Sequence, residues 1–339
     1  MEYVKKLPSV EEVRTRFSLS EDLQRKRLER IREIQDVLSG RDGRKLLFIG
    51  PCSADREDAV LEYCSRLAGL AEKVGGSLLI VPRVYTGKPR TKGTGYKGMI
   101  HRPHSDSVHD DLEAGLIASR KMHLDVIRET GFFCADEMLY PDAMDYFMDL
   151  LAYVAVGARS VEDQYHRLTA SGLEIPVGMK NPMDGSLSVL LNSIEAAQQR
   201  QSFVYRGWVV NTAGNSYAHA ILRGFVDRMG GTHPNYHFED ICQLHDLYRK
   251  SSLKNPSVII DCNHSNSGKQ ADAQIRIAKE IRNLCRDDGG INSFVRGYMV
   301  ESYLEDGAQI VGGGVYGKSI TDPCIGWKKT ESLVEILAG

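Results

Sequence analysis

The chain has 339 residues, with 43 basic and 45 acidic side chains and a formal net charge of −2. A chain of this length suits one (β/α)8 barrel with an extension, or two average domains. The balanced charge gives no reason to expect nucleic acid or an anionic membrane as a partner. No apolar run approaches the roughly 18 residues that span a bilayer, and the N-terminus has no apolar signal core. We therefore expect a cytoplasmic protein.

The cysteines point to one special position. There are seven, an odd number without any Cys-x-x-Cys pair, so they do not predict a disulfide framework. We expect most of them to be small buried hydrophobes. Cys52 differs because it follows the apolar run 46–49 and the chain-breaking pair Gly50-Pro51. This pattern predicts a buried strand with a soft metal ligand or nucleophile at its exit.

The N-terminal segment contains one clear helix signal. Residues 1–19 show no clear pattern, whereas Ser20 can cap a helix that Gly40 can end. Between them lies an apolar stripe made of Leu23, Leu28, Ile31, Ile34 and Leu38. The helix either packs on its own barrel, or forms a subunit contact or a lid over one barrel end, and spacing alone does not choose.

From residue 46 onward, short apolar runs alternate with helical stretches. We expect barrel strands over residues 46–49, 78–85, 132–138, 154–160, 176–181, 218–224, 258–263 and 294–300, and an additional β segment over 202–211. We expect helices over residues 55–73, 112–129, 187–199, 237–249, 269–286 and 328–338, and one from Asp142. This alternation predicts an α/β fold, a (β/α)8 TIM barrel over residues 45–339, with an N-terminal helical extension over 1–44. The long polar or Gly-rich loops over 86–98 and 303–325 are expected to be functional.

Two glycine motifs in these loops match nucleotide-binding patterns but lack the required context. Gly312–Ser319 fits the phosphate-loop pattern, yet Pro323 would break the helix that must follow. Gly93–Gly98 fits the dinucleotide fingerprint, yet it lies well past its strand and does not lead into a helix start. We expect neither motif to bind a nucleotide.

Each predicted barrel strand delivers one charged or metal-binding residue at or just beyond its C-terminal end. The set is Cys52, Arg83, Glu137, Arg159, Lys180, Arg223, His264 and Glu301. In a (β/α)8 barrel the C-terminal strand ends meet at one face, where active sites are built. The sequence therefore predicts that these side chains share one site.

The cations at this face predict an anionic substrate. They are Arg83, Lys88, Arg90, Lys97, Arg159, Lys180 and Arg223. Glu137 and Glu301 are too few to neutralise them all. Arginine binds carboxylate or phosphate oxygens in pairs, and lysine acts as a point charge. Two phosphates plus a carboxylate would fit, on one molecule or shared between two.

A second set of strand-end residues predicts a metal site. Cys52, His264, Glu301 and Asp322 together offer sulfur, nitrogen and oxygen donors. This mixture suits a divalent transition ion such as Mn, Fe, Co or Zn, whereas Mg²⁺ avoids thiolate. A metal beside an anion cradle indicates Lewis-acid activation of a carbonyl. The residues leave open whether the chemistry is aldol-type or phosphoryl transfer on small phosphorylated molecules.

Several short motifs carry a resemblance to a known family. They are Gly50-Pro-Cys-Ser53, Lys88-Pro-Arg-Thr91, Tyr96-Lys-Gly98, Gly157-Ala-Arg159, Pro176-Val-Gly-Met-Lys-Asn181, Leu222-Arg-Gly224, Asn263-His-Ser-Asn266 with Lys269, Val300-Glu-Ser302 and Gly317–Trp327. These motifs occur in the same order in type I 3-deoxy-7-phosphoheptulonate (DAHP) synthases, which the chain resembles from about residue 45 to 330.

The resemblance implies a metal-dependent transferase that condenses phosphoenolpyruvate with erythrose 4-phosphate, the first step of the shikimate pathway. It places the metal ligands on Cys52, His264, Glu301 and Asp322. It places the phosphoenolpyruvate contacts on Arg83, Lys97, Glu137, Arg159, Lys180, Arg223 and His264, and the erythrose 4-phosphate contacts on Lys88, Pro89, Arg90, Thr91 and Asp322. The resemblance implies catalytic roles for Lys97, Cys52 and His264. By analogy with the family, Lys97 would protonate the developing alkoxide. We also expect a homodimer or homotetramer.

The chain departs from the familiar members of this family in two segments. The loop Thr91–Lys97 is one residue longer, with Tyr96 in place of tryptophan, and Gly224–Asn235 is longer as well. Two alternatives remain. A related synthase that uses arabinose 5-phosphate is disfavoured by the loop Lys88–Thr91 and by the extension. A barrel that only senses metabolites is disfavoured by the complete metal-ligand and cation sets.

Overall fold

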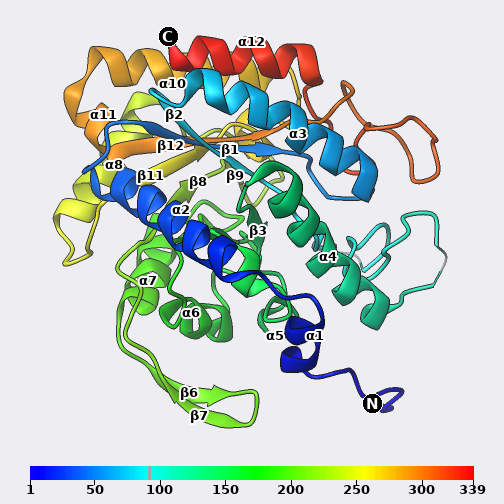
Figure 1. Cartoon of the computed structure of the whole chain (residues 1–339). Coiled ribbons are helices and arrows are strands. Elements are labelled where there is room, and N and C mark those ends of the chain that lie inside the picture. Colours follow the sequence, from blue (N-terminus) through cyan, green and yellow to red (C-terminus); the bar gives the residue numbers. More distant parts are fainter. Residues whose placement is uncertain (91–92, 108) are drawn as a thin grey trace.

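The structure is a computed structural model of the chain that describes residues 1–90, 93–107 and 109–339. Eight parallel strands surround its centre (Figure 1), in the order β2-β1-β12-β11-β8-β5-β4-β3. They are β1 (Lys45–Gly50), β2 (Leu78–Pro82), β3 (Ala135–Glu137), β4 (Tyr153–Val156), β5 (Val177–Lys180), β8 (Ala218–Leu222), β11 (Val258–Asp261) and β12 (Val295–Glu301). The predicted (β/α)8 barrel is thus confirmed.

Most barrel strands form because their sequences are apolar almost throughout, whereas the short β3 is Ala-Asp-Glu. In β1 every residue from Leu46 to Gly50 is buried, and in β2 all five residues are buried. Parallel strands that are covered on both faces need such continuous apolar runs rather than alternation. Their side chains fill the barrel interior and the layer beneath the surrounding helices.

The barrel closes at a seam between β2 and β3. There Arg83 forms an isolated parallel bridge with Ala135, whereas β1 pairs with β2 over five residues. A side chain strengthens this seam. Both the backbone N–H and the hydroxyl of Thr86 donate to the buried carboxylate of Asp136, at 3.0 and 2.6 Å.

Helices lie between the strands and cover the outside of the barrel. They are α3 (Glu57–Val74), α4 (Leu112–Thr130), α5 (Pro141–Met144), α6 (Gln164–Ser171), α7 (Leu187–Gln198), α8 (Phe238–Arg249), α9 (His264–Ser267), α10 (Ala273–Asp287), α11 (Gly289–Phe294) and α12 (Trp327–Ala338). The predicted helix from Asp142 is only the short α5. The sequence patterns did not indicate α6 or α11, because both are short and begin at an aspartate cap rather than with a long apolar period.

The N-terminal extension covers the N-terminal ends of the barrel strands. It contains α1 (Val10–Arg16) and α2 (Glu21–Ser39), and α2 begins and ends at the predicted caps. Arg27 donates to the carbonyl of Leu151 at 2.7 Å, just before β4. Gln35 reaches the carbonyl of Glu174, just before β5, at 3.4 Å. Helix α2 therefore packs on its own barrel, at the end opposite to the C-terminal strand ends.

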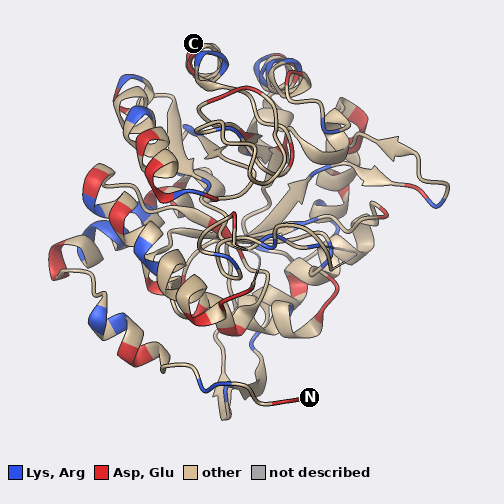
Figure 2. Cartoon of the chain, turned by 90° about the vertical axis from the view of Figure 1, so that its right-hand side faces the viewer, with Lys and Arg blue, Asp and Glu red and all other residues tan. Residues whose placement is uncertain are grey.

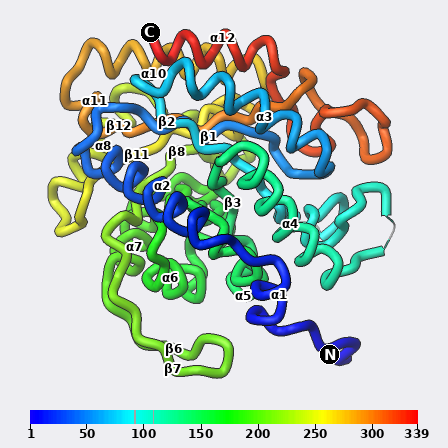
Figure 3. Tube along the Cα trace, viewed as in Figure 1, coloured from blue at the N-terminus to red at the C-terminus, as the bar shows by residue number. Residues whose placement is uncertain are grey.

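Two hairpins interrupt the barrel pattern. Strands β6 (Ser202–Tyr205) and β7 (Trp208–Asn211) confirm the additional β segment, and their hairpin extends away from the barrel (Figures 1 and 3). Its two turn residues, Arg206 and Gly207, have φ values of 52° and 81°, as a tight hairpin turn requires. The second hairpin, β9 (Phe225–Val226) with β10 (Thr232–His233), occupies the longer segment after Arg223 and was not predicted.

The surface and the glycine motifs agree with the sequence-based expectations. Acidic and basic residues are interspersed along the helices (Figure 2). Residues 320–326 after the phosphate-loop pattern form no helix, and α12 begins at Trp327. Within the described residues, no helix is both long and apolar enough to cross a membrane.

Candidate active site

The C-terminal strand ends surround a cavity of about 330 Å³. Ten predicted site residues line it: Arg83, Lys88, Pro89, Arg90, Glu137, Arg159, Lys180, Arg223, His264 and Asp322. They come from six strand ends and from the loops after β2 and β12. The barrel therefore brings together residues that lie up to about 240 positions apart in the sequence.

A wider cavity of about 1020 Å³ lies outside the barrel, between α3, α4 and the loop 309–315. Its lining includes Asp55, Glu57 and Asp58 from the start of α3 and Lys121 from α4. None of the predicted site residues that the structure describes lines it. We therefore assign the candidate active site to the smaller cavity, where the cations and the possible metal ligands converge.

Two buried ion pairs form the floor of the site. Arg83 lies 3.1 Å from a carboxylate oxygen of Glu301, and Lys180 donates to Glu137 at 3.0 Å. Burial disfavours the charged acids, but Lys180 holds the pKa of Glu137 below its usual value. Arg83 acts in the same way on the pKa of Glu301. Both acids are therefore ionised at neutral pH, which keeps the two cations fixed beneath the cavity.

Tyr85 and Asp261 belong to the site, although sequence reasoning gave neither a role. The guanidinium carbon of Arg83 lies 4.1 Å from the ring centre of Tyr85, and the ammonium of Lys180 lies 5.4 Å from it. This aromatic face stabilises both cations. Tyr85 lies two positions after Arg83, the spacing that puts strand side chains on one face, and this signal could have identified Tyr85.

Asp261 orients the candidate ligand His264. Its carboxylate lies 2.9 Å from Nδ1 of His264, and Nε2 of the same ring lies 3.8 Å from Glu301. A ligating histidine commonly has such a partner behind its free ring nitrogen. Burial lowers the pKa of His264, so its ring is neutral at pH 7. The position of Asp261 at the end of an apolar run was its only sequence signal.

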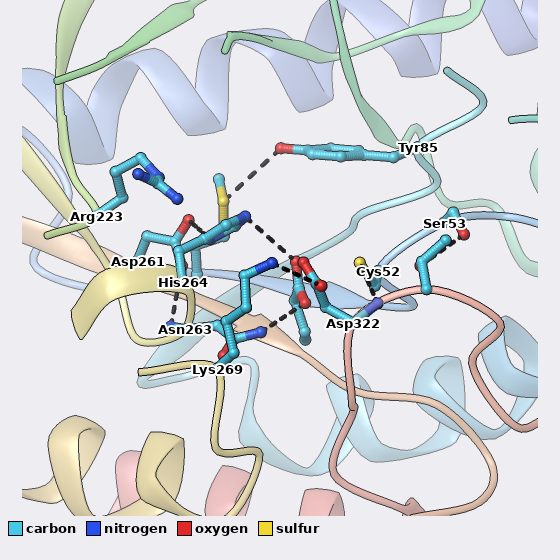
Figure 4. A network of polar contacts seen from close by, with 12 residues as sticks. Cys52, Ser53, Tyr85, Arg223, Asp261, Asn263, His264, Lys269 and Asp322 are labelled. Carbon is cyan, nitrogen blue, oxygen red and sulfur yellow. Dashed lines mark hydrogen bonds and ion pairs between the residues drawn. The ribbon is translucent and has the colours of Figure 1, made fainter. Parts of the chain in front are cut away.

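Three of the four predicted metal ligands form a tight group. One donor atom each from Cys52, Glu301 and Asp322 lies within 4.8 Å of the others. His264 adjoins the group through its contact with Glu301. Figure 4 shows the surrounding network, in which Lys269 donates to Asp322 at 3.0 Å. Asn263 donates to the second oxygen of Glu301 at 2.6 Å.

The donor atoms of this group fit a divalent ion. One carboxylate oxygen of Glu301, Oε1, is buried and faces Arg83 at 3.1 Å and Nε2 of His264 at 3.8 Å, but it accepts no hydrogen bond among the described residues. Lys88 and Lys269 lower the pKa of Asp322 to about 2 against the effect of burial, so this carboxylate is ionised. Burial raises the pKa of the Cys52 thiol, and a divalent ion would displace its proton.

The loop after β2 places its cations differently. Lys88 reaches the sulfur and the carbonyl of Cys52, and Arg90 donates to the carbonyl of Tyr96 at 2.7 Å. Lys97 does not line the cavity and instead donates to Asp110 at 2.8 Å. The expected contact Thr91 lies outside the described residues.

The fold and the cavity define a (β/α)8-barrel enzyme. The chain matches the model of the DAHP synthetase I family over residues 21–335. It belongs to that family. The Tyr-sensitive phospho-2-dehydro-3-deoxyheptonate aldolase of Escherichia coli K12 is 38% identical over 337 residues, which cover 97% of this chain and 91% of the relative.

Two further comparisons agree. The Phe-sensitive phospho-2-dehydro-3-deoxyheptonate aldolase of Escherichia coli K12 is 40% identical over 313 residues, covering 90% of this chain and 86% of the relative. A solved structure of the phospho-2-dehydro-3-deoxyheptonate aldolase from Francisella tularensis SCHU S4 has a TM-score of 0.92 at 31% identity. It aligns with 100% of this chain and 97% of that one.

Proposed function

We propose that the protein is a metal-dependent DAHP synthase. It condenses phosphoenolpyruvate with erythrose 4-phosphate and water, and it releases DAHP and phosphate. The observation that carries this proposal is the juxtaposition of a cation-lined cavity with the group Cys52, Glu301 and Asp322. Family membership supports the same reaction. The bond-forming step joins C3 of phosphoenolpyruvate to the aldehyde carbon, water adds at C2, and phosphate leaves by C–O cleavage.

The strand-borne cations bind phosphoenolpyruvate in this proposal. Arg83, Lys180 and Arg223 are buried at the base of the cavity, and Arg159 and His264 line the same cavity. Fixed cations in a site shielded from water bind a phosphate and a carboxylate more strongly than mobile surface groups. Because Glu137 pairs with Lys180, Glu137 fixes the position of the Lys180 ammonium and limits the net positive charge of the cavity.

The loop-borne residues bind erythrose 4-phosphate. Lys88, Pro89 and Arg90 line the cavity on the side of the loop, and Asp322 lies on the side of β12. Thr91 is part of the same proposal by resemblance. Arg90 can present its terminal N–H groups to the phosphate, since its hydrogen bond to the Tyr96 carbonyl comes from Nε.

We assign Cys52, His264, Glu301 and Asp322 as ligands of a divalent Mn, Fe, Co or Zn ion. Such an ion, when bound, supplies Lewis-acid polarisation of the aldehyde carbonyl. The chain itself orients the ligands: Asp261 holds His264, Asn263 holds Glu301, and Lys269 holds Asp322. Lys97 is the proposed donor of the proton that the developing alkoxide takes up.

The test uses metal-stripped protein with phosphoenolpyruvate and erythrose 4-phosphate, before and after addition of Mn²⁺. We expect phosphate release and DAHP formation only after the metal is added. Activity with arabinose 5-phosphate but not with erythrose 4-phosphate would replace this proposal by the related synthase. Absence of turnover with both aldoses, with metal present, would favour a non-catalytic sensor.

We also propose a homodimer or homotetramer of a chain organised as an extension (1–44) and a barrel (45–339). The support for an oligomer is the hairpin β6–β7, on which Val204, Trp208 and Val209 are 68%, 75% and 77% exposed. Apolar side chains that are exposed together mark association surfaces. Analytical ultracentrifugation tests the proposal, and the variant Trp208→Glu is expected to dissociate the oligomer.

A further inference from the structure

We propose that Asp110 is the resting partner of Lys97: its carboxylate holds the ammonium of Lys97 outside the cavity until an anionic substrate takes that ammonium over. The inference rests on the proposed function, because the role of Lys97 toward phosphoenolpyruvate belongs to it. Asp110 is thereby a positioning residue, which acts on substrate binding through Lys97 and does not touch the substrate.

The backbone of Lys97 already lies beside the cavity. Its carbonyl accepts a hydrogen bond of 3.0 Å from the N–H of Lys88, which lines the cavity. The next residue, Gly98, has a φ of +94°, and a Cβ there would lie 2.3 Å from the Thr86 carbonyl oxygen. On the other side, the buried Tyr96 is held by its hydroxyl to the carbonyl of Ala54. The backbone is therefore fixed, and the flexible part is the side chain of Lys97.

The side chain of Lys97 lies outside the cavity where the other cations converge. The six other cations of the predicted set line the cavity, whereas Lys97 is absent from the lining. Its ammonium lies 2.8 Å from Oδ2 of Asp110, and the two side chains are 30% and 29% exposed. A pair this accessible to water is weak, so a substrate phosphate or carboxylate in the cavity can compete for the ammonium.

Asp110 can release Lys97 without being left unpaired. Arg102 donates to its other oxygen, Oδ1, at 2.9 Å, and Nδ1 of His101 lies 3.2 Å from Oδ2. Hydrogen bonds from Lys97 and Arg102 lower the pKa of Asp110, so it is ionised at neutral pH. One carboxylate thus serves up to three cationic groups, and the departure of one leaves the others in place.

The test measures phosphoenolpyruvate binding by calorimetry, with Mn²⁺-loaded protein and without the aldose. Asp110→Asn keeps the side-chain shape and removes the charge. We expect the dissociation constant for phosphoenolpyruvate to fall about threefold, because binding no longer has to break the ion pair. Asp106→Asn is the matched control, since this exposed carboxylate lies on the same loop and makes no ion pair with Lys97. Its dissociation constant is expected to be unchanged.

A double variant distinguishes the effect of losing the ion pair from the general effect of removing a negative charge near the cavity. In Lys97→Met protein, adding Asp110→Asn is expected to leave the dissociation constant unchanged. Unchanged or weaker binding in Asp110→Asn alone would overturn the inference, and so would equal tightening in Asp106→Asn or in the Lys97→Met background. Asp110→Ser provides a second variant for the case that the asparagine variant does not fold. If the wild-type protein forms DAHP, a negative result rejects only the role of Asp110; if it neither binds phosphoenolpyruvate nor forms DAHP, the proposed function fails as well.

Discussion

The strand ends and the loop after β2 contribute cations to one cavity in opposite ways. Arg83 and Lys180 are buried, and each is held by an acid at the end of the strand two places along the barrel. Lys88, Arg90 and Lys97 come from a loop, and their partners are a thiol, a carbonyl and the exposed Asp110. The first group is fixed before a substrate arrives, whereas the second must exchange partners. The difference indicates that the strands set the geometry and that the loop adapts to the substrate.

The largest effect is expected when a strand end loses its proposed metal ligand. Cys52→Ala removes the only sulfur donor of the proposed site. We expect turnover to fall by at least about a hundredfold, since even partners behind the ligands are commonly worth 10–100-fold. The measurement is phosphoenolpyruvate consumption with saturating Mn²⁺, together with the melting temperature.

Cys64→Ala is the control for this prediction. Cys64 is equally buried but packs within α3, away from the cavity. We expect this variant to lose some stability and to keep its turnover with saturating metal. Wild-type turnover in Cys52→Ala would reject the metal assignment.

The next effect concerns the buried pair of Lys180 and Glu137. Lys180→Met leaves the carboxylate of Glu137 buried without its partner at 3.0 Å. We expect the free energy of unfolding at pH 7 to fall by about 3 kcal/mol, as for other broken buried pairs. Urea unfolding measures it. Lys26→Met, which breaks an exposed pair with Asp22, is the control and is expected to change the free energy of unfolding little.

The pH dependence of this pair has a definite sign. In the wild type the pKa of Glu137 lies below its ordinary value of 4.5, so its contribution to stability is present above pH 4.5 and is lost as the pH falls through the folded-state pKa. In Lys180→Met, burial without the cation raises this pKa, and protonation of Glu137 relieves the penalty. We expect the stability difference between the two proteins to shrink between pH 7 and pH 4. A constant difference would contradict the account of this pair.

The smallest effect on activity is expected when the loop after β2 loses one of its cations. Arg90→Ala removes one cation from the loop side of the cavity, and we expect KM for erythrose 4-phosphate to rise roughly tenfold. KM for phosphoenolpyruvate should change little, because its proposed contacts come mainly from the strand ends. Arg66→Ala, an exposed residue paired with Glu62 on α3, is the control in steady-state kinetics. An unchanged response to erythrose 4-phosphate would argue against the role of the loop.

The sequence predicted the strand-borne part of the site better than the loop-borne part. Apolar runs locate the barrel strands, and the residue at the end of each run must lie at the shared C-terminal face. The convergence of Arg83, Lys180 and Glu301 therefore follows from the order of strands and helices along the sequence. The caps Ser20 and Gly40 likewise gave the bounds of α2.

Loop conformations depend on partners that spacing does not reveal. The pairing of Lys97 with Asp110 joins residues 13 positions apart across a turn. The hairpin β9–β10 depends on Asp227, which accepts hydrogen bonds from two backbone N–H groups within the turn. The eight residues of α6 are too few to show a helical period of their own.

The seam between β2 and β3 gives the barrel a preferred place to open. Closure there relies on one bridge and on the contacts of Asp136 with Thr86, rather than on a full ladder. Local unfolding starts where the fewest backbone hydrogen bonds must break. The amide of Val84, which donates to Ala135 across the seam, should therefore exchange its hydrogen for deuterium sooner than the amides of β1. Each such opening separates Arg83 from Glu137, so a ligand held by both would slow the exchange.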